Sequence, residues 1–478
     1  MFSNVPFPLV RRSRPAAKGY KRPAMIMVAA MIAVTGGGVA TAAPAAAAEP
    51  EQNYIVVLKD GAQNTDTVAA THGKKFGFAP SRTYKNALNG YAASMSAPEA
   101  KSLATDPTVD FVSSGREFRR PPDPAPNTEL APFWWQRMGQ TLDDATAEDG
   151  HNSVRVNIAV IDSGIDGTHP DLNIRGGVDC QSGSPVTVAP VDPFGHGTMV
   201  AGIIGAKNNS IGIIGAAAGT PLWSVRVVDD AGTIPEANLL CAVDWVTSTQ
   251  KDKDPRNDIS VANMSITGPA TDLGNCGAGV DPFHHAICRS VEAGVTYTVA
   301  AGNESADIAA SVPSAYDEVL TVTAMADFDG RPGGLAAPPV CASVDWSAAG
   351  QSDDHAAFFS NFATQPADKR HTLAAPGVCM ASTAPGGYSV DHGTSFASPA
   401  VAGAVALCIS KKACKGSGKE VVDQFLTQTE AYNAVNADFG FVGDPLRPTG
   451  SQYYGYLAQI ADYCPSETPK RTSCPGRK

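Results

Sequence analysis

Three side chains in this 478-residue chain could together make a nucleophile. Asp162 lies in Ala-Val-Ile-Asp-Ser-Gly-Ile-Asp, His196 in Gly-His-Gly-Thr-Met-Val-Ala-Gly, and Ser395 in Gly-Thr-Ser-Phe-Ala-Ser-Pro. A serine hydroxyl is a weak nucleophile until an adjacent imidazole takes its proton, and the imidazole needs a buried carboxylate that fixes its tautomer and stabilises its charged form. The three residue types therefore predict acyl transfer, with a serine nucleophile, a histidine base and an aspartate partner.

The residues around these motifs predict the elements that must bring them together. Residues 156–161 are mostly apolar and are typical of a buried parallel strand, at whose carboxyl end Asp162 would point into a cleft. The small and apolar residues of 199–206 and 396–409 predict helices packed closely on that sheet. The base and the nucleophile would then lie at helix N-termini, where the helix dipole favours developing negative charge.

The three motifs, in the chain order Asp, His, Ser, resemble the subtilisin family of serine proteases. The resemblance implies an α/β fold with a doubly wound, mostly parallel sheet flanked by helices, and a serine endopeptidase that needs no cofactor for its chemistry. It also assigns the oxyanion hydrogen bond to Asn303, which follows the apolar run 295–301, with the Ser395 backbone amide as second donor. In isolation, an Asn that follows Gly is more typical of a turn.

The first 48 residues have the composition of a secretory signal peptide. Residues 1–23 carry six basic side chains and no acidic one, and an apolar stretch from Ala24 to about Ala43 precedes a run of alanines. An N-terminal membrane anchor is the alternative, since about 20 weakly polar residues could just span a bilayer. Three consecutive glycines and the alanine run favour cleavage. We therefore expect a secreted protein without a stable membrane anchor, and the export route stays open.

The composition is that of a globular protein, with 43% hydrophobic and 17% charged residues. The formal net charge of −11 becomes about −17 once the basic first 48 residues are removed. A surface of that sign disfavours binding to nucleic acid.

Ten cysteines in an exported chain indicate disulfides, and none of their spacings is convincing for zinc. Neighbouring positions suggest three pairs and leave two more, although spacing alone proves none of them. The suggested pairs are Cys276 with Cys288, Cys341 with Cys379, Cys408 with Cys414, Cys180 with Cys241 and Cys464 with Cys474.

Residues 53–115 predict a separate small unit with the element order β-α-β-α-β. Strands are expected over 54–58, 90–95 and 109–113, and helices over 65–75 and 98–105. This order resembles the subtilisin-type propeptide, which is an inhibitor and folding chaperone. An unrelated α+β domain is the alternative.

The resemblance divides the chain into a signal peptide (1–48), an α+β propeptide (49–120) and a catalytic domain (121–478). The proline-rich segment 121–126 predicts an exposed linker, and residues 133–138 resemble the start of the mature domain. Processing is therefore expected between about residues 115 and 131. The mature protein would be a monomer whose partners are polypeptide substrates and its own propeptide, which acts as inhibitor.

The resemblance also implies a structural calcium site. Residues 207–213 look like the family's calcium loop, and Asp171 looks like its carboxylate ligand. Calcium takes about six to eight oxygen ligands, which the Asp171 carboxylate, the Asn209 amide and the carbonyls of Ile211 and Ile213 would partly provide. A plain polar turn is the alternative.

Family analogy assigns the substrate to an edge that pairs with extended peptide and to a primary pocket walled by backbone. The expected substrate-binding residues are Gly232, Thr233, Ser265, Ile266, Thr267, Ala301 and Gly302. Thr267 stands where relatives often have glycine, so its side chain should narrow the cleft. Asp229 and Asp230 would favour basic substrate residues unless they are merely solvated.

The complete motifs favour a secreted endopeptidase made as a zymogen. A processing protease that cuts after basic residues is one alternative, and a triad-bearing scaffold that acts mainly by binding is the other. The segment at about 331–357 has no counterpart that assigns it a role beyond a clamp over the rim of the cleft.

Overall fold

The computed structural model describes residues 51–59, 61, 64–118, 132–139, 154–209, 211–274, 276 and 280–460. All of these residues belong to one compact unit. The expected signal peptide (1–48), the expected linker (121–126) and the expected pair of Cys464 with Cys474 lie outside the described residues.

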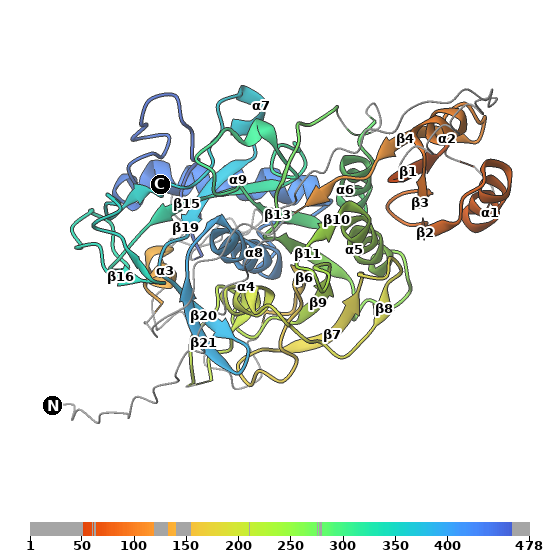
Figure 1. The fold of residues 1–478 in the computed structure, drawn as a ribbon. Helices are drawn as coiled ribbons and strands as arrows, with labels where there is room; N and C mark the ends of the chain where they lie inside the picture. The colour runs from red at the N-terminus through yellow and green to blue at the C-terminus, as the bar shows by residue number, and fades with distance from the viewer. Residues whose placement is uncertain are drawn as a thin grey trace, which may run out of the picture. The chain divides into compact units, whose positions relative to one another are not determined.

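A four-stranded antiparallel sheet, in the order β2-β3-β1-β4, forms the N-terminal unit of the described chain (Figure 1). Val56 and Tyr91 of this sheet are buried together with Leu103 of α2, whereas Ile55 and Val57 belong to a different hydrophobic cluster on the opposite face. The elements of the N-terminal unit are β1 (Gln52–Leu58), α1 (Thr65–Phe76), β2 (Pro80–Tyr84), β3 (Gly90–Met95), α2 (Ala97–Leu103) and β4 (Val109–Ser114).

The predicted β-α-β-α-β order of this unit is wrong in one respect, because β2 lies between α1 and β3. Strand β2 has the sequence Pro-Ser-Arg-Thr-Tyr and lies at the sheet edge, and only Tyr84 of the strand is buried. It therefore lacks the apolar alternation by which a half-buried strand is identified. Helix α2 also ends at Leu103, two residues earlier than expected.

A nine-stranded, mostly parallel sheet is the centre of the remaining chain, in the order β18-β15-β13-β11-β6-β9-β7-β8 with β19 beside β15. Among the strands that the structure describes, only β8 and β18 pair with it in the antiparallel sense. The predicted doubly wound fold is confirmed. The strands are β6 (Asn157–Asp162), β7 (Ile174–Asp179), β8 (Val186–Thr187), β9 (Leu222–Arg226), β11 (Ile259–Met264), β13 (Thr296–Ala300), β15 (Leu320–Ala326), β18 (His355–Ala356) and β19 (Thr372–Pro376).

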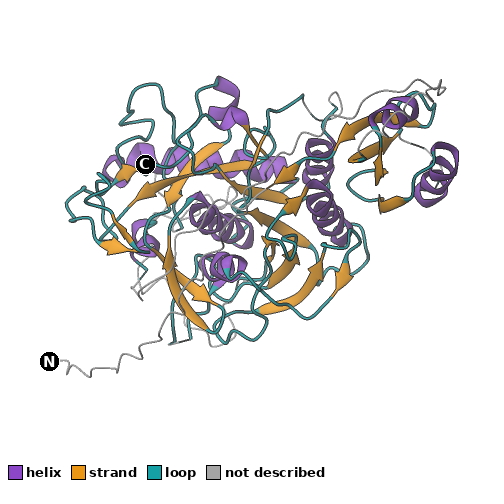
Figure 2. Ribbon diagram, in the orientation of Figure 1, coloured by secondary structure: helices purple, strands orange, loops and turns teal. Residues whose placement is uncertain are grey.

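Helices cover both faces of this sheet (Figure 2). Successive side chains of β6 alternate between two hydrophobic cores, because Ile158 and Val160 lie in one and Ala159 and Ile161 in the other. The first core contains apolar residues of α4 (His196–Gly205) and α8 (Thr394–Ser410), and the second those of α5 (Glu236–Thr249) and α6 (Pro282–Glu292). Burial on both faces explains why the strand segments are continuous apolar runs.

The strand order reverses at β6, so the sheet has a topological switch point there. Strands β7 and β9 lie on one side of β6, whereas β11, β13, β15 and β19 follow on the other side. In open α/β sheets, ligands bind at the carboxyl ends of the strands next to such a reversal. Asp162 ends β6, and Asn303 follows the end of β13, so both expected functional residues lie at this edge.

Shorter elements complete the described chain. Arg137, at the end of α3, is fully buried, and its guanidinium donates to the Asp354 carboxylate at 2.7 Å and to the carbonyls of Phe439 and Gly440. These elements are β5 (Glu117–Phe118), α3 (Phe133–Arg137), β10 (Ile234–Pro235), β12 (Gly268–Pro269), β14 (Ser311–Val312), β16 (Val340–Cys341), β17 (Val344–Asp345), α7 (Pro366–Lys369), β20 (Met380–Ala384), β21 (Gly387–Asp391), α9 (Gly418–Val435) and two 3-10 turns, Ile308–Ala310 and Ala437–Phe439.

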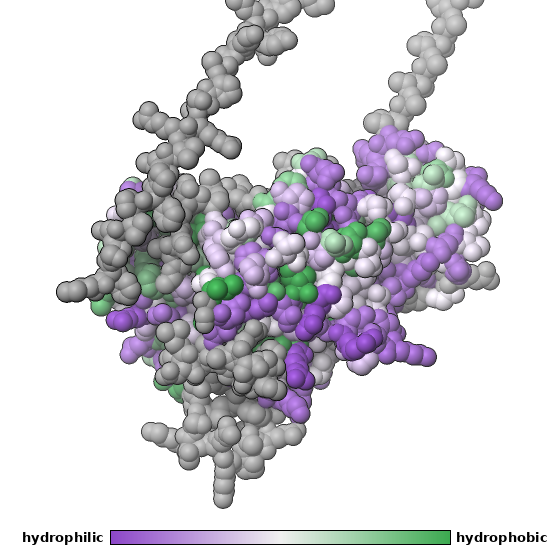
Figure 3. Space-filling model, turned by 90° about the horizontal axis from the view of Figure 1, so that it is seen from below, coloured by the Kyte–Doolittle hydropathy of each residue, from purple (hydrophilic) through white to green (hydrophobic). Residues whose placement is uncertain are grey.

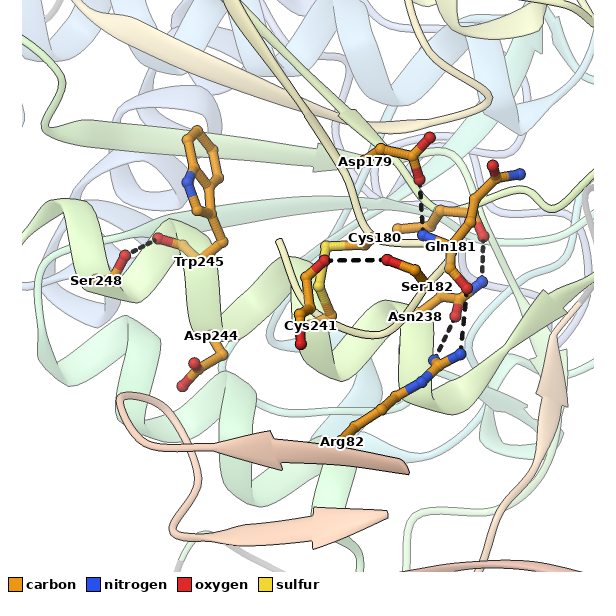
Figure 4. Close-up of a disulfide and its surroundings, with 12 residues drawn as sticks. Arg82, Asp179, Cys180, Gln181, Ser182, Asn238, Cys241, Asp244, Trp245 and Ser248 are labelled. Atoms are coloured by element: carbon orange, nitrogen blue, oxygen red, sulfur yellow. Dashed lines mark hydrogen bonds between the residues drawn. A yellow bond between two sulfur atoms is a disulfide. The ribbon is translucent and has the colours of Figure 1, made fainter. Parts of the chain in front are cut away.

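Four disulfides join the described part of the chain and match four of the suggested pairs. Figure 4 shows the first of them, between Cys180 after β7 and Cys241 on α5. The others join Cys276 with Cys288, Cys341 with Cys379 and Cys408 with Cys414.

The described helices include none that is both long and apolar enough to cross a membrane. On the face seen in Figure 3, hydrophobic residues form small groups among hydrophilic ones.

His284, in the first turn of α6, is a buried side chain with two acidic partners. Its Nδ1 lies 3.0 Å from Asp272 and its Nε2 lies 2.6 Å from Glu318, and its ring stacks on Tyr316 at 4.0 Å. Burial lowers the pKa of His284, but the hydrogen bonds to the two carboxylates outweigh burial and raise it from 6.5 to about 9. The imidazolium therefore stabilises the fold fully below about pH 6.5, and this contribution is lost as the pH rises through 9.

Replacing His284 with Gln should destabilise the protein by about 2 to 3 kcal/mol near pH 6 and by much less near pH 10, because only the charged form gains from the carboxylates. Urea unfolding of the two proteins at both pH values measures this difference. Equal destabilisation at both pH values would show that His284 contributes by packing alone.

Candidate active site

Asp162 and His196 are hydrogen-bonded at the carboxyl edge of the sheet. The two carboxylate oxygens of Asp162 lie 2.8 and 2.9 Å from Nδ1 of His196, and both side chains are 1% exposed. The Ser163 backbone N–H also donates to Asp162, at 2.7 Å. Because a carboxylate accepts hydrogen bonds, Nδ1 carries the imidazole proton and Nε2 is the basic nitrogen.

Residues before His196 start α4 at the place where the imidazole meets Asp162. Gly195 adopts a positive φ of 87°, and the Asp192 carboxylate accepts from the backbone N–H groups of Gly195 and Thr198, each at 2.8 Å. Asp192 thus caps the helix N-terminus. A Cβ on Gly197 would lie 2.0 Å from the Gly164 carbonyl, so only glycine allows α4 to approach the loop after β6 this closely.

Ser395 lies in the first turn of α8 and is 2% exposed. Its carbonyl accepts a 2.6 Å hydrogen bond from Ser265 Oγ, whereas its own Oγ has no hydrogen-bond partner among the described residues. The next residue, Phe396, packs against the His196 ring with centroids 5.3 Å apart. The turn is therefore anchored through its backbone, and its hydroxyl is uncommitted.

Asn263 on β11 ties the start of α8 to the sheet. Its side-chain oxygen accepts from Ser398 Oγ at 2.8 Å and from Thr298 Oγ1 at 3.1 Å, and its Nδ2 donates to Ser265 Oγ at 3.1 Å. The sequence alone identified this stretch only as a pocket wall. Its polar side chains hold the nucleophile turn. An Asn between apolar residues of this strand was the signal that the sequence offered, since a polar group at such a position needs hydrogen-bond partners.

Asn303 is oriented by the residue that precedes Ser395. Its side-chain oxygen accepts from both the N–H and the Oγ1 of Thr394, each at 2.9 Å. Because both contacts come from donors, the oxygen of the amide must face Thr394, and Nδ2 is left to donate elsewhere. Nδ2 lies beside Gly393, where a Cβ would be 3.4 Å from it. The amide donor is thus directed along the nucleophile turn.

Gly302 and Ala301 hold the loop that carries Asn303. Gly302 has a φ of +105°, and a Cβ there would lie 2.3 Å from Asn361 Nδ2, so no other residue fits. Its N–H donates to Thr394 Oγ1 at 3.1 Å. The N–H of Ala301 donates to Val322 and its carbonyl accepts from Asn361, so both backbone groups are engaged within the fold.

The other expected wall residues follow the end of β11. Ser265, Ile266 and Thr267 are buried, with exposed fractions of 0, 1 and 8%. Thr267 precedes β12, which pairs with β14. Whether its side chain narrows the cleft stays a prediction.

Gly232 and Thr233 lie on a turn before the edge strand β10. Gly232 has a φ of +78°, and the Asp229 carboxylate accepts from the N–H and the Oγ1 of Thr233. The next two residues, in β10, pair with β5 of the N-terminal unit in antiparallel register, Ile234 opposite Phe118. This edge therefore already binds an extended segment of the same chain.

The carboxylates of Asp229 and Asp230 contact residues of the catalytic domain. Asp229 is used within its own turn, and the Asp230 side chain is 93% exposed and contacts Arg226 at 3.0 Å. The Glu236 and Asp281 carboxylates, in contrast, contact Arg116 of the N-terminal unit, and sequence reasoning missed both. Both begin helices, where acidic residues are common, so no local signal distinguished them.

The expected calcium residues lie close together around a buried carboxylate. Asp171 is fully buried, its Oδ2 accepts from the Ile213 N–H at 3.3 Å and from the Tyr388 hydroxyl at 3.2 Å, and its Oδ1 has no partner among the described residues. Asn209 accepts from the Ile211 N–H at 3.2 Å. Burial raises the pKa of Asp171. A buried carboxylate oxygen without a donor fits a cation ligand.

Two other clusters of potential ligands occur in the described residues. Cys276 and Cys288 lie near His284 and Glu318, but the cysteines form a disulfide. The second cluster contains Asp327, Asp329 and Asp353, whose carboxylates accept backbone N–H bonds from Gly330, Arg331, Phe328 and Ala336. Asp327 Oδ1 also has no hydrogen-bond partner among the described residues, but the buried Arg137 guanidinium lies 3.7 Å from it and already supplies a positive charge.

The segment at 331–357 supports the nucleophile turn from one side. Trp346 is fully buried, and its ring packs edge-on against His392 at 4.7 Å. The disulfide between Cys341 and Cys379 joins this segment to the residue before β20. His392 lies three positions before Ser395, so the segment braces the turn from which the nucleophile emerges.

Comparisons with known families agree with this geometry. A model described as the subtilase family matches residues 154–442, which is more than half of the chain. A model described as peptidase inhibitor I9 matches residues 53–119.

Curated relatives include subtilisins. Subtilisin E of Bacillus subtilis is 31% identical over 372 residues, covering 76% of this chain and 81% of that protein. A subtilisin of Bacillus pumilus is 34% identical over 279 residues, covering 57% of this chain and 84% of that protein.

Solved structures share the fold. The epidermin leader peptide processing serine protease of Staphylococcus aureus has a TM-score of 0.61 and 19% identity, with 86% of this chain and 98% of that chain covered. Fervidolysin of Fervidobacterium pennivorans, a keratinolytic enzyme related to subtilisin, has a TM-score of 0.57 and 20% identity; 86% of this chain and 60% of that chain are covered. At these identities the likeness concerns the fold alone.

Proposed function

This chain belongs to the subtilase family and is a serine endopeptidase, and we propose that Asp162, His196 and Ser395 form its catalytic triad. The observation that carries the proposal is the buried 2.8 Å hydrogen bond from His196 Nδ1 to Asp162, on an imidazole that packs against the residue after Ser395. With the proton held on Nδ1, Nε2 takes the Ser395 proton as the hydroxyl attacks a peptide carbonyl. Asp162 then stabilises the imidazolium, which returns the proton to the leaving amine.

The oxyanion of the tetrahedral intermediate is bound by Asn303 Nδ2 and the Ser395 N–H in this proposal. Support comes from the two hydrogen bonds that Thr394 donates to Asn303 Oδ1, because they hold Nδ2 in a fixed direction before substrate arrives. Donors that are fixed in advance cost no reorganisation during the reaction, which is why such donors contribute strongly to rate. The substrate-binding role of Gly232, Thr233, Ser265, Ile266, Thr267, Ala301 and Gly302 belongs to the same proposal.

The N-terminal unit is the enzyme's own inhibitory propeptide, and the chain is a zymogen. Two contacts support this. Strand β5 occupies the β10 edge as an extended substrate would, and Asp244 on α5 accepts from the backbone N–H groups of Asn86 and Ala87. Since residues up to Phe118 lie along the edge, the processed bond falls between 118 and 131.

Secretion, removal of residues 1–48 and a monomeric mature enzyme without nucleic-acid partners complete the proposal. The four disulfides support an oxidising compartment, in which such bonds persist.

Structural calcium is held by Asp171, Asn209 and the carbonyls of Ile211 and Ile213 in this proposal. The unpartnered Oδ1 of the buried Asp171 supports it. The ion would supply a positive charge that stabilises this carboxylate and its loop, and it takes no part in peptide hydrolysis.

Replacing Ser395 with Ala should abolish peptide hydrolysis and leave the precursor unprocessed, because the same hydroxyl would cut the propeptide junction. Loss of a triad serine costs about 10⁶ in rate. The precursor band on a gel after overnight incubation, compared with that of Ser410→Ala at the exposed end of the same helix, measures this. Processing of the Ser395→Ala chain at the normal rate would exclude Ser395 as the nucleophile.

Replacing Asn303 with Leu should lower kcat by about 10²- to 10³-fold with little change in KM, because it removes a donor used mainly in the transition state. Steady-state kinetics on one fluorogenic peptide measure both constants. An unchanged kcat would mean that the oxyanion is bound by other groups.

A chelator should clearly lower the melting temperature of the inhibitor-inactivated mature enzyme, and that of Asp171→Ala hardly at all. A cation bound only by the folded state stabilises it by about 2.7 kcal/mol at a hundredfold excess over Kd. Differential scanning calorimetry with and without chelator measures the shift. Asp423→Ala, which alters an exposed carboxylate on α9, is the control and should keep the full shift. Equal shifts in wild type and Asp171→Ala would remove this residue from the site.

A further inference from the structure

A propeptide arginine is bound by two buried carboxylates of the catalytic domain. The Arg116 guanidinium donates to Glu236 at 2.7 and 3.1 Å and to Asp281 at 2.6 and 3.1 Å. The carboxylate side chains are 0 and 1% exposed, whereas the arginine side chain is 21% exposed. Arg116 thus inserts from the surface into an acidic pocket that belongs to the enzyme.

Residues of the catalytic domain hold this pocket in shape. Asp281 caps α6, since its Oδ1 accepts from the backbone N–H groups of Phe283 and His284, and its Oδ2 accepts from the Tyr316 hydroxyl at 2.8 Å. Tyr316 in turn stacks on His284. Glu236 is the first residue of α5, where the helix dipole favours a negative charge. These contacts all lie within the catalytic domain and do not involve the propeptide.

Arg116 enters the pocket from a chain that lies along the substrate edge. Its carbonyl accepts a 2.9 Å hydrogen bond from the Glu236 N–H, and the next two residues form β5, which pairs with β10. Such pairing uses backbone groups and tolerates any sequence. An extended peptide bound to this edge would have one residue opposite Ile234, as Phe118 is here. The side chain two positions before that residue would then lie where Arg116 lies, next to Glu236 and Asp281.

The charge of the pocket selects for a cation. Burial raises the pKa of Glu236, the Arg116 charge opposes this, and Asp281 raises it further. Burial lowers the pKa of Arg116, but Glu236 first, with Tyr316 and Asp281, outweighs burial and raises it. Two adjacent carboxylates that a bound peptide covers are therefore unfavourable without a cation, and a guanidinium satisfies both with its planar fork.

A second propeptide arginine, Arg82, also contacts α5 but meets no carboxylate there. Arg82 donates to the neutral Asn238 at 2.5 Å and to the Gln181 carbonyl at 3.2 Å, beside the Cys180 disulfide (Figure 4). Burial lowers the pKa of Arg82. Arg82 reaches α5 from strand β2, not from the segment along β10. Contact between propeptide and enzyme thus does not in itself require a carboxylate, and the acidic pair occurs where the substrate edge begins.

We propose that Glu236 and Asp281 form a specificity pocket of the mature protease that selects substrates with an arginine upstream of the cleaved bond. The proposal rests on the proposed function of Ser395 and names the substrate class of that site. Because the proposed processed bond comes after Phe118, Arg116 is the third residue before the bond or lies further upstream. The preference for basic substrate residues that was expected from Asp229 and Asp230 is thereby assigned to a different pair.

Cleavage-site profiling of a denatured proteome with the matured wild-type enzyme is the first test. Mass spectrometry of the products should reveal arginine enriched at one fixed position, at least the third before the bond. A profile with no enriched basic residue at any such position overturns the proposal.

A matched peptide series is the second test. Internally quenched peptides with the sequence of residues 113–133, in which Arg119 and Arg120 are replaced by Gln, carry Arg, Lys, Gln or Leu at the position of Arg116. For the wild-type enzyme, kcat/KM should be at least about 30-fold higher with Arg than with Gln, because truncating one partner of a desolvated charge pair weakens binding by that order. Lys should fall between them, since it lacks the planar fork. Equal values for Arg and Gln overturn the proposal.

Variants of the pocket test whether Glu236 and Asp281 cause the preference for arginine. In Glu236→Gln and Asp281→Asn, the ratio of the Arg to the Gln peptide should fall to less than about fivefold, because neutral acceptors do not discriminate by charge. Asn also caps helices well, so α6 should still form. Asp230→Asn removes an exposed charge near the same edge and should keep the wild-type ratio.

The series separates failure of the two proposals. If no peptide is cut, the assignment of Ser395 fails; if all peptides are cut equally, only the pocket fails. Should a pocket variant not mature, the wild-type series and the cleavage profile still decide the question.

Discussion

A buried carboxylate with a fixed hydrogen-bond partner is the feature on which the rest of the structure depends. Asp162 is 1% exposed, and an isolated charge at such a site would be strongly unfavourable. The structure meets this constraint with the 2.8 Å bond to His196 and the N–H of Ser163. Strand β6 must end at Asp162, α4 must begin at His196, and Gly197 must be a glycine so that the two can meet.

The same constraint explains the contact between the propeptide and the enzyme. Glu236 and Asp281 are buried at the starts of α5 and α6, and Arg116 is the cation that compensates them. The apolar face of the propeptide sheet, with Ile55 and Val57, packs into the same hydrophobic cluster as Leu240 of α5. Inhibition by the propeptide and substrate choice by the mature enzyme would thus use one surface, first occupied by Arg116 and later by an arginine of the substrate.

The sequence was sufficient wherever a function resides in contiguous residues or in a regular apolar pattern. The strands and helices that carry Asp162, His196 and Ser395 were predicted for that reason, since residues buried on both sheet faces form apolar runs. Strand β2 was missed because it is a polar edge strand. The pairing of Arg116 with Glu236 was also missed, since the two residues lie 120 positions apart and each alone is an ordinary charged residue.

The central claim is that the hydrogen bond between His196 and Asp162 makes His196 the base for Ser395. The most direct test is to label the enzyme with a fluorophosphonate and to identify the labelled peptide by mass spectrometry. We expect a single adduct, on Ser395, and a labelling rate for Asp162→Asn that is about 10⁴-fold lower, because the amide stabilises the wrong imidazole tautomer. Asp166→Asn, in the loop after β6, should label at the wild-type rate. An adduct on another residue would exclude Ser395 as the nucleophile, and rapid labelling of Asp162→Asn would show that His196 does not depend on Asp162.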